Sequence, residues 1–118
     1  MQPHLRLRLQ RDFARLRQHG QTVKHRLFIL SYGQNGQPHN RYGFIVSRRL
    51  GKAVTRNRIR RRLREAVRVF DEAIISSQHN QGHDIVLIAR QVILQATFHE
   101  IRQALETTLR RAGLLTTQ

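Results

Sequence analysis

The chain has 118 residues, the usual size of one domain, and 39% of them are hydrophobic, which is enough for a single modest core. Lys and Arg total 22 against seven Asp and Glu, so the formal net charge is +15 and a polyanionic partner is expected. No apolar run is long enough to cross a bilayer, and the first residues carry no secretion signal. Cysteine is absent, which excludes disulfides, thiol nucleophiles and cysteine-based metal sites. We expect one soluble cytoplasmic domain, residues 1–118, with a core over about 8–113.

The positive charge is almost all arginine, since Lys24 and Lys52 are the two lysines. The planar guanidinium grips phosphate oxygens bidentately and stacks on bases, whereas an ammonium is a hydrated point charge. An anionic membrane or an acidic protein could also supply negative charge. Basic helices that bind such partners usually carry lysine and a large interfacial aromatic. Composition therefore favours nucleic acid.

The first predicted element is a short helix over roughly Gln10 to His19. Phe13 and Leu16 share one face of this helix, and arginines occupy much of the rest. Gly20 follows in the position that a helix C-terminal cap prefers. The pattern therefore predicts a basic helix with a narrow apolar face.

Two strands are predicted next, residues 23–32 and 42–47, because both runs are rich in β-branched, aromatic and aliphatic side chains. The segment between them, residues 33–40, is a turn by its Gly, Asn and Pro content. We expect the two strands to pair as an antiparallel hairpin.

Residues 52–77 have a helical period, with Thr55 as the expected N-cap. One stripe at about 100° per residue is apolar and should face a core. It comprises Ile59, Leu63, Ala66, Val67, Phe70, Ala73 and Ile74. A neighbouring face carries Asn57, Arg61, Arg64 and Arg68. The helix should bury one side and present a dense cationic one.

Residues 84–90 predict a strand that is covered on both faces. A final helix should begin at Thr97, which forms a capping box with Glu100. Its expected apolar face is Phe98, Ile101, Leu105 and Leu109. The order α-β-β-α-β-α predicts an α+β fold with helices packed on a small sheet. The long helix joins its two flanking strands as a crossover, so these strands should be parallel.

The sequence offers few side chains whose spacing would suit catalysis. Asp71 and Glu72 are helix neighbours that point about 100° apart and cannot flank one bond. His79 and His83, with Asp84, come nearest to a metal cluster, but we expect both histidines to be solvent-exposed in a loop. The sequence therefore predicts no catalytic residue and no metal ligand in the protein.

The segment from Arg48 to Arg68 holds ten basic residues and one acid, Glu65. A solvated helix face normally alternates the two signs, so the missing counter-charges point to phosphate. Major-groove readers of DNA place a few base-reading residues on a more balanced helix. A helix that is nearly all arginine suits the backbone shape of structured RNA.

The run GKAVTRNRIRRRLREAVR, residues 51–68, resembles the signature of the bacterial ribonuclease P protein subunit, an Arg-Asn-Arg stretch that opens a long basic helix. The resemblance covers nearly the whole chain. It includes Asp12-Phe13 in the first helix, the strand RYGF followed by VSRR at residues 41–49, and a buried strand that ends in Ala-Arg at Arg90.

The resemblance implies a two-layer α/β sandwich with a small mixed sheet and a left-handed β-α-β crossover, like domain 2 of ribosomal protein S5. It also implies that ribonuclease P RNA, with Mg²⁺ held mainly by that RNA, removes the 5′ leader of precursor tRNA, while the protein assists without cleaving. Neither a membrane nor a small-molecule substrate is implied. The implied contacts to the catalytic RNA are Arg48, Arg49, Lys52, Arg56, Asn57, Arg58, Arg60, Arg61, Arg64 and Arg68. The implied leader contacts are Phe13, Arg17 and Arg90.

Two positions depart from the family pattern. Arg17 stands where a second aromatic is frequent, and Ser31 stands where a tyrosine is frequent, with Tyr32 next to it. Either electrostatics replaces some stacking on the leader, or the strand register differs by one residue. Two other functions compete: a general RNA- or ribosome-binding module, and a protein nuclease. Phe13 also has an alternative role as a core residue.

Overall fold

The computed structural model describes residues 10–116, except for the side chains of Gln10, Arg11, Asp12 and Arg17. Its helices are α1 (Gln10–His19), α2 (Ala53–Ser77) and α3 (Phe98–Arg111). Its strands are β1 (Gln21–Lys24), β2 (Phe28–Gln34), β3 (Arg41–Ile45) and β4 (His83–Ala89). Two short 3₁₀ turns, η2 (Arg48–Leu50) and η3 (Gln91–Gln95), follow β3 and β4. The α+β class is confirmed, with one strand more than the sequence predicted.

The four strands form one mixed sheet in the order β1-β2-β4-β3. The expected parallel pairing of the strands that flank α2 is confirmed, because β3 runs parallel to β4. The expected antiparallel hairpin of β2 with β3 is wrong, since β4 lies between them and pairs with both. The physical reason is burial: β4 is the most apolar strand, and the centre of the sheet is the place where both of its faces are covered.

The single strand expected over residues 23–32 is instead the hairpin of β1 and β2. The chain turns at residues 25–27, where the His25 Nδ1 atom accepts a hydrogen bond from the Leu27 backbone N–H. Leu27 is 2% exposed, so this turn is tied to the core by an apolar side chain rather than marked by glycine or proline.

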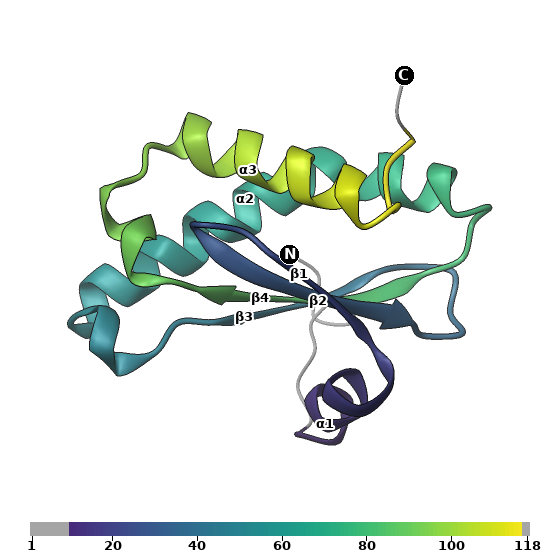
Figure 1. The fold of residues 1–118 in the computed structure, drawn as a ribbon, viewed down its shortest axis with the longest axis horizontal. Helices are drawn as coiled ribbons and strands as arrows, with labels where there is room; N and C mark the ends of the chain where they lie inside the picture. Colours follow the sequence, from purple (N-terminus) through teal and green to yellow (C-terminus); the bar gives the residue numbers. More distant parts are fainter. Residues whose placement is uncertain (1–9, 117–118) are drawn as a thin grey trace.

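Helices α2 and α3 cover one face of the sheet, and α1 lies on the other face (Figure 1). The main core lies between the sheet and the two long helices, and six of the seven residues of the expected α2 stripe are buried in it. Ala73 is the exception, because its short side chain lies at the margin of the stripe and is exposed. Thr55 is not the N-cap of α2: the helix begins one turn earlier, after Lys52.

The capping box of Thr97 and Glu100 at the start of α3 is confirmed. Phe98 does not join the apolar face of α3, since it lies in the first turn and is 37% exposed. Gly20 ends α1, though not in a left-handed conformation. A Cβ atom at Gly20 would lie 2.6 Å from the Leu16 carbonyl oxygen and 2.9 Å from that of Tyr32, so glycine lets α1 lie close to β2.

Candidate nucleic-acid interface

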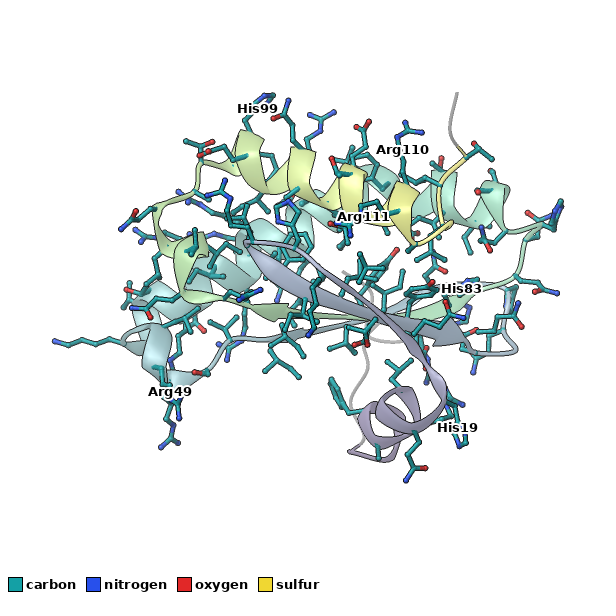
Figure 2. All side chains as sticks on the ribbon, in the orientation of Figure 1. His19, Arg49, His83, His99, Arg110 and Arg111 are labelled. Atoms are coloured by element: carbon teal, nitrogen blue, oxygen red, sulfur yellow. The ribbon has the colours of Figure 1, made fainter. Side chains whose placement is uncertain are left out.

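The carboxyl ends of β3 and β4 meet at one edge of the sheet because the two strands are parallel. Arg48 and Arg49 follow β3 in η2, and Arg90 follows β4 as the residue that precedes η3. The two 3₁₀ turns are in contact. Figure 2 shows Arg49 projecting from this edge, whereas His19 and His83 lie at the opposite end of the molecule. Residues from both predicted RNA-contact sets therefore share one end of the fold.

The junction of η2 with α2 is shaped by Gly51. Its backbone φ is +140°, a value that favours glycine, and its carbonyl oxygen accepts a hydrogen bond of 3.2 Å from the Arg56 Nε–H. Helix α2 starts without a side-chain cap and without an acidic residue in its first turn. The free backbone N–H groups and the helix dipole therefore add positive potential to that of Lys52 and Arg56.

The cationic residues of α2 extend from this junction along the helix. Most of the predicted RNA-contact side chains are exposed: Arg48, Arg49, Lys52, Asn57, Arg58, Arg61 and Arg68. Three are half-buried: Arg56, Arg60 and Arg64. Some of these side chains are held in place by neighbours on α2: Arg60 Nη1 donates to Asn57 Oδ1 at 3.0 Å, and Arg68 pairs with Glu65 at 3.2 Å. We call these ten residues the basic surface.

Two arginines of α2 differ from the others. Arg62 lies outside the basic surface, because its Nη1 donates to the Ala96 carbonyl oxygen at 3.3 Å. The helical period places Arg64 on the cationic face of α2. In the structure, however, Arg64 does not face fully away from the core. Its Nε atom is buried without a hydrogen-bond partner among the described residues, while the residue as a whole is half-buried. Arg64 therefore has a packing role as well as a charge.

The face of the sheet that carries α1 holds a second group of residues. Ile29, Ile88 and Ile45 are register partners across β2, β4 and β3, so their side chains form a row on one face. Ile29 and Ile88 are half-buried, and Ile45 is 40% exposed. Phe13 is half-buried and packs with Ile88 against the buried pair Leu16 and Val86. We call Ile29, Ile88 and Ile45 the isoleucine row; it depends on strand register and was not predicted.

The other two predicted leader contacts are Arg90 and Arg17. Arg90 is exposed, and its Nη1 donates to the His25 carbonyl oxygen at 3.2 Å, which ties the end of β4 to the β1–β2 turn. Arg17 belongs to α1, but its side chain is outside the described residues. Phe13 thus lies on the face that carries the isoleucine row, Arg90 lies just after the end of β4, and the contact expected of Arg17 stays a prediction.

The comparisons with known proteins decide the family. A family model described as Ribonuclease P matches residues 1–113. The chain belongs to the ribonuclease P protein family. It is 42% identical over 117 residues to the ribonuclease P protein component of Symbiobacterium thermophilum, covering 98% of this chain and 96% of that protein. It is 36% identical over 109 residues to the component of Caldanaerobacter subterraneus subsp. tengcongensis, covering 92% and 90%.

Solved structures of ribonuclease P proteins have the same fold. The protein from Staphylococcus aureus matches with a TM-score of 0.83 at 34% identity, covering 95% of this chain and 98% of that one. The protein from Thermotoga maritima matches with a TM-score of 0.77 at 33% identity, covering 90% and 96%. This chain is therefore a protein component of ribonuclease P, a ribonucleoprotein endoribonuclease of tRNA processing, and the general RNA-binding module is set aside.

Of the two departures from the ribonuclease P pattern, the one at Ser31 lies on the sheet. Ser31 pairs with Val86 and its hydroxyl lies 3.3 Å from that of Thr22, so it faces the α1 side. The Tyr32 hydroxyl donates to the carbonyl oxygen of Ala112, just after α3, and therefore faces the opposite side. The register is as the alternation predicted, and this ribonuclease P protein carries serine at that position of its α1 face.

The titratable side chains outside the basic surface are mainly structural. Asp71 accepts hydrogen bonds from the Tyr42 hydroxyl and from Asn40. His79 is exposed as expected, but the prediction of an exposed loop is wrong for His83, which is the first residue of β4 and is 4% exposed. Burial lowers the pKa of His83 below its ordinary value, so the ring is neutral at neutral pH.

Among the side chains that the structure describes, no three His, Cys, Asp or Glu are grouped in a way that could hold a metal ion. The described helices also include none that is long and apolar enough to cross a membrane.

Proposed function

We propose that the basic surface binds the RNA subunit of ribonuclease P. The observation that carries this proposal is the uncompensated charge of residues 48–64, which contain nine Arg or Lys and no Asp or Glu. A folded domain that keeps so many like charges close together is stabilised when phosphates neutralise them. The contacts are made by the ten residues of the basic surface, Arg48 to Arg68, named above.

The chemistry of this surface fits the backbone of structured RNA. Guanidinium groups along α2 can bind phosphate oxygens in pairs, and the uncapped N-terminus of α2 adds backbone N–H donors to Lys52 and Arg56. Double-stranded and folded RNA is recognised mainly by shape and by its phosphates and ribose hydroxyls. Dense arginine without a set of base-reading side chains suits that mode.

The α1 side of the sheet is the proposed binding site for the 5′ leader of precursor tRNA. Phe13 supplies an aromatic face beside the isoleucine row, and aromatic stacking tolerates any base. Arg90 and Arg17 supply charge for the leader phosphates. Because Arg90 and the basic surface share one end of the fold, a leader that leaves the catalytic RNA can reach the α1 side without crossing the core.

The chemical step belongs to the RNA in this proposal. The described carboxylates and histidines do not fit a protein-held metal ion, so Mg²⁺ is assigned to the RNA and no step is routed through the protein. The protein instead screens phosphate repulsion between two RNAs, as divalent cations do. It acts in the cytoplasm, with the catalytic RNA and precursor tRNA as partners.

The test is cleavage of precursor tRNA by the RNA alone, by the RNA with protein, and by rigorously RNA-free protein, each at low and high Mg²⁺. The protein should stimulate the RNA most at low Mg²⁺, and should not cleave when the RNA is omitted. Cleavage by RNA-free protein that a single substitution abolishes would show that this chain is itself a nuclease and would overturn the proposal.

A further inference from the structure

Asp84 is a buried carboxylate on the α1 side of the sheet, and three elements bind it. Its side chain is 0% exposed. Arg41 in β3 donates from Nε to Oδ1 and from Nη2 to Oδ2, both at 2.8 Å. Asn35 in the β2–β3 loop donates to Oδ1 at 3.0 Å, and Arg15 in α1 donates from Nη2 to Oδ2 at 2.6 Å.

The two arginines have different roles in this cluster. A carboxylate removed from water must be paired, and Arg41 does this with a two-pronged contact from a side chain that is 18% exposed. Arg15 is 45% exposed, so it is not needed to fill the interior. Its contact is an ion pair that joins α1 to the sheet.

Among the described side chains of α1, the other contacts that hold the helix on the sheet are apolar. Leu16 is buried with Val86, and Phe13 packs beside them with Ile88. At about 100° per residue, Phe13 and Arg15 lie on opposite sides of Leu16 around the helix axis. The apolar contact at Leu16 is non-directional and leaves α1 free to roll about its axis. A charge-assisted hydrogen bond on one flank restricts that roll.

We propose that the Arg15–Asp84 pair is a latch that fixes the roll of α1, and that it thereby sets the orientation of Phe13 beside the isoleucine row. Asp84 and Arg15 are positioning residues for leader recognition, acting through Phe13. The inference rests on the proposed leader site and adds the element that holds that site in shape.

The test uses Arg15→Met in the full chain reconstituted with ribonuclease P RNA. Methionine keeps the helix propensity and much of the side-chain length but cannot bind Asp84. Hydrogen exchange of the α1 amides should become about tenfold faster, because one charge-assisted bond that closes the helix onto the sheet is lost. The preference of the holoenzyme for precursor over mature tRNA should fall by about tenfold, with affinity for the catalytic RNA unchanged.

Two further variants sharpen the result. Arg102→Met removes an exposed arginine from α3, away from α1, and should change neither measurement. Arg15→Lys keeps the charge and one donor, and should restore part of both the exchange protection and the leader preference.

Unchanged α1 exchange in Arg15→Met, with unchanged preference, would overturn the latch. Faster exchange with unchanged preference would overturn the positioning role. Lost preference with unchanged exchange would show that Arg15 binds a leader phosphate directly, which also overturns positioning. If the unaltered holoenzyme shows no preference for precursor tRNA, the proposed leader site itself fails, and α1 exchange still reports whether the latch exists.

Discussion

The two faces of the sheet are built differently. On the side of α2 and α3, a continuous cluster of buried aliphatic and aromatic side chains joins both helices to every strand of the sheet except β1. On the side of α1, the buried apolar cluster consists of Leu16 and Val86, with Phe13 and Ile88 partly covered. Polar contacts also contribute on this face, through the hydrogen bonds that Arg15 and Arg41 donate to Asp84. The first face holds the fold together, and the second is less completely covered.

This difference explains where the charge is placed. The arginines of α2 lie on the outside of the helix that closes the first face, so the basic surface rests on a helix that is anchored in the main core. The proposed leader site rests on α1, whose described side chains form only a small apolar cluster with the sheet. A rigid platform would suit a stably bound RNA, whereas a lightly held helix would suit a substrate that must be released.

The largest expected effect comes from the core of the first face. Leu63 is 0% exposed, and Leu63→Ala should lower the free energy of unfolding by about 3–5 kcal/mol. Leu16→Ala on the second face should cost less, toward about 2 kcal/mol, because the small cluster around it can relax. Chemical denaturation of both variants measures the difference. Equal losses would contradict the contrast between the faces.

Next in size is the effect of Phe13 on the leader. Phe13→Ala should weaken precursor tRNA binding by about 1–3 kcal/mol and leave mature tRNA unaffected, because a stacked base is lost. Phe13→Leu separates the roles, since leucine keeps apolar volume but has no aromatic face. The measurement is holoenzyme affinity for both tRNAs, with thermal melts of the protein. A stable Leu variant with full discrimination would make Phe13 a packing residue.

Removing one charge from the basic surface should have a smaller effect, seen in how affinity for the catalytic RNA depends on salt concentration. Arg61→Ala should reduce the slope of log affinity against log salt by nearly one unit for the catalytic RNA, because one phosphate contact is lost. Arg61 is the better probe than Arg64, whose buried Nε would confuse packing with charge. Arg102→Ala on α3 is the matched control. A parental slope in Arg61→Ala would remove that residue from the RNA contact.

The smallest effect is that of pH on stability. Burial lowers the pKa of His83, so the unfolded chain binds its proton more readily than the native chain does. Protonation of His83 therefore does not change the free energy of unfolding above about pH 6.5. Below that pH, it lowers the free energy of unfolding. Melts at pH 7.5 and 5.5 should show a smaller decline for His83→Phe than for the parent. His99→Gln, an exposed control, should show the parental decline.

Local signals predicted the helices well. The bounds of α1, the capping box of α3 and the buried stripe of α2 all follow from spacing and from caps that a few neighbouring residues define. The parallel pair β3 and β4 was also predictable, because a helix connects two strands across one sheet. These features depend on contacts close in sequence, which is where patterns carry information.

Long-range features were not predictable from the sequence. The insertion of β4 between β2 and β3 depends on which strand gains most from central burial, and no local turn marks it. The isoleucine row needs the register of three strands. The sequence places Asp84 at the start of a strand but gives no sign of its partners, which lie 43 to 69 residues away along the chain. A site built from such contacts becomes visible only when the strands are placed.

The most direct test of the account is crosslinking from defined positions in the holoenzyme bound to precursor tRNA. A photoreactive phenylalanine analogue at position 13 should crosslink to the 5′ leader, and the same analogue at position 61 should crosslink to the catalytic RNA. At position 103, an exposed site on α3, it should crosslink to neither RNA. A crosslink from position 13 to the catalytic RNA, or from position 61 to the leader, would contradict the separation of the two binding surfaces.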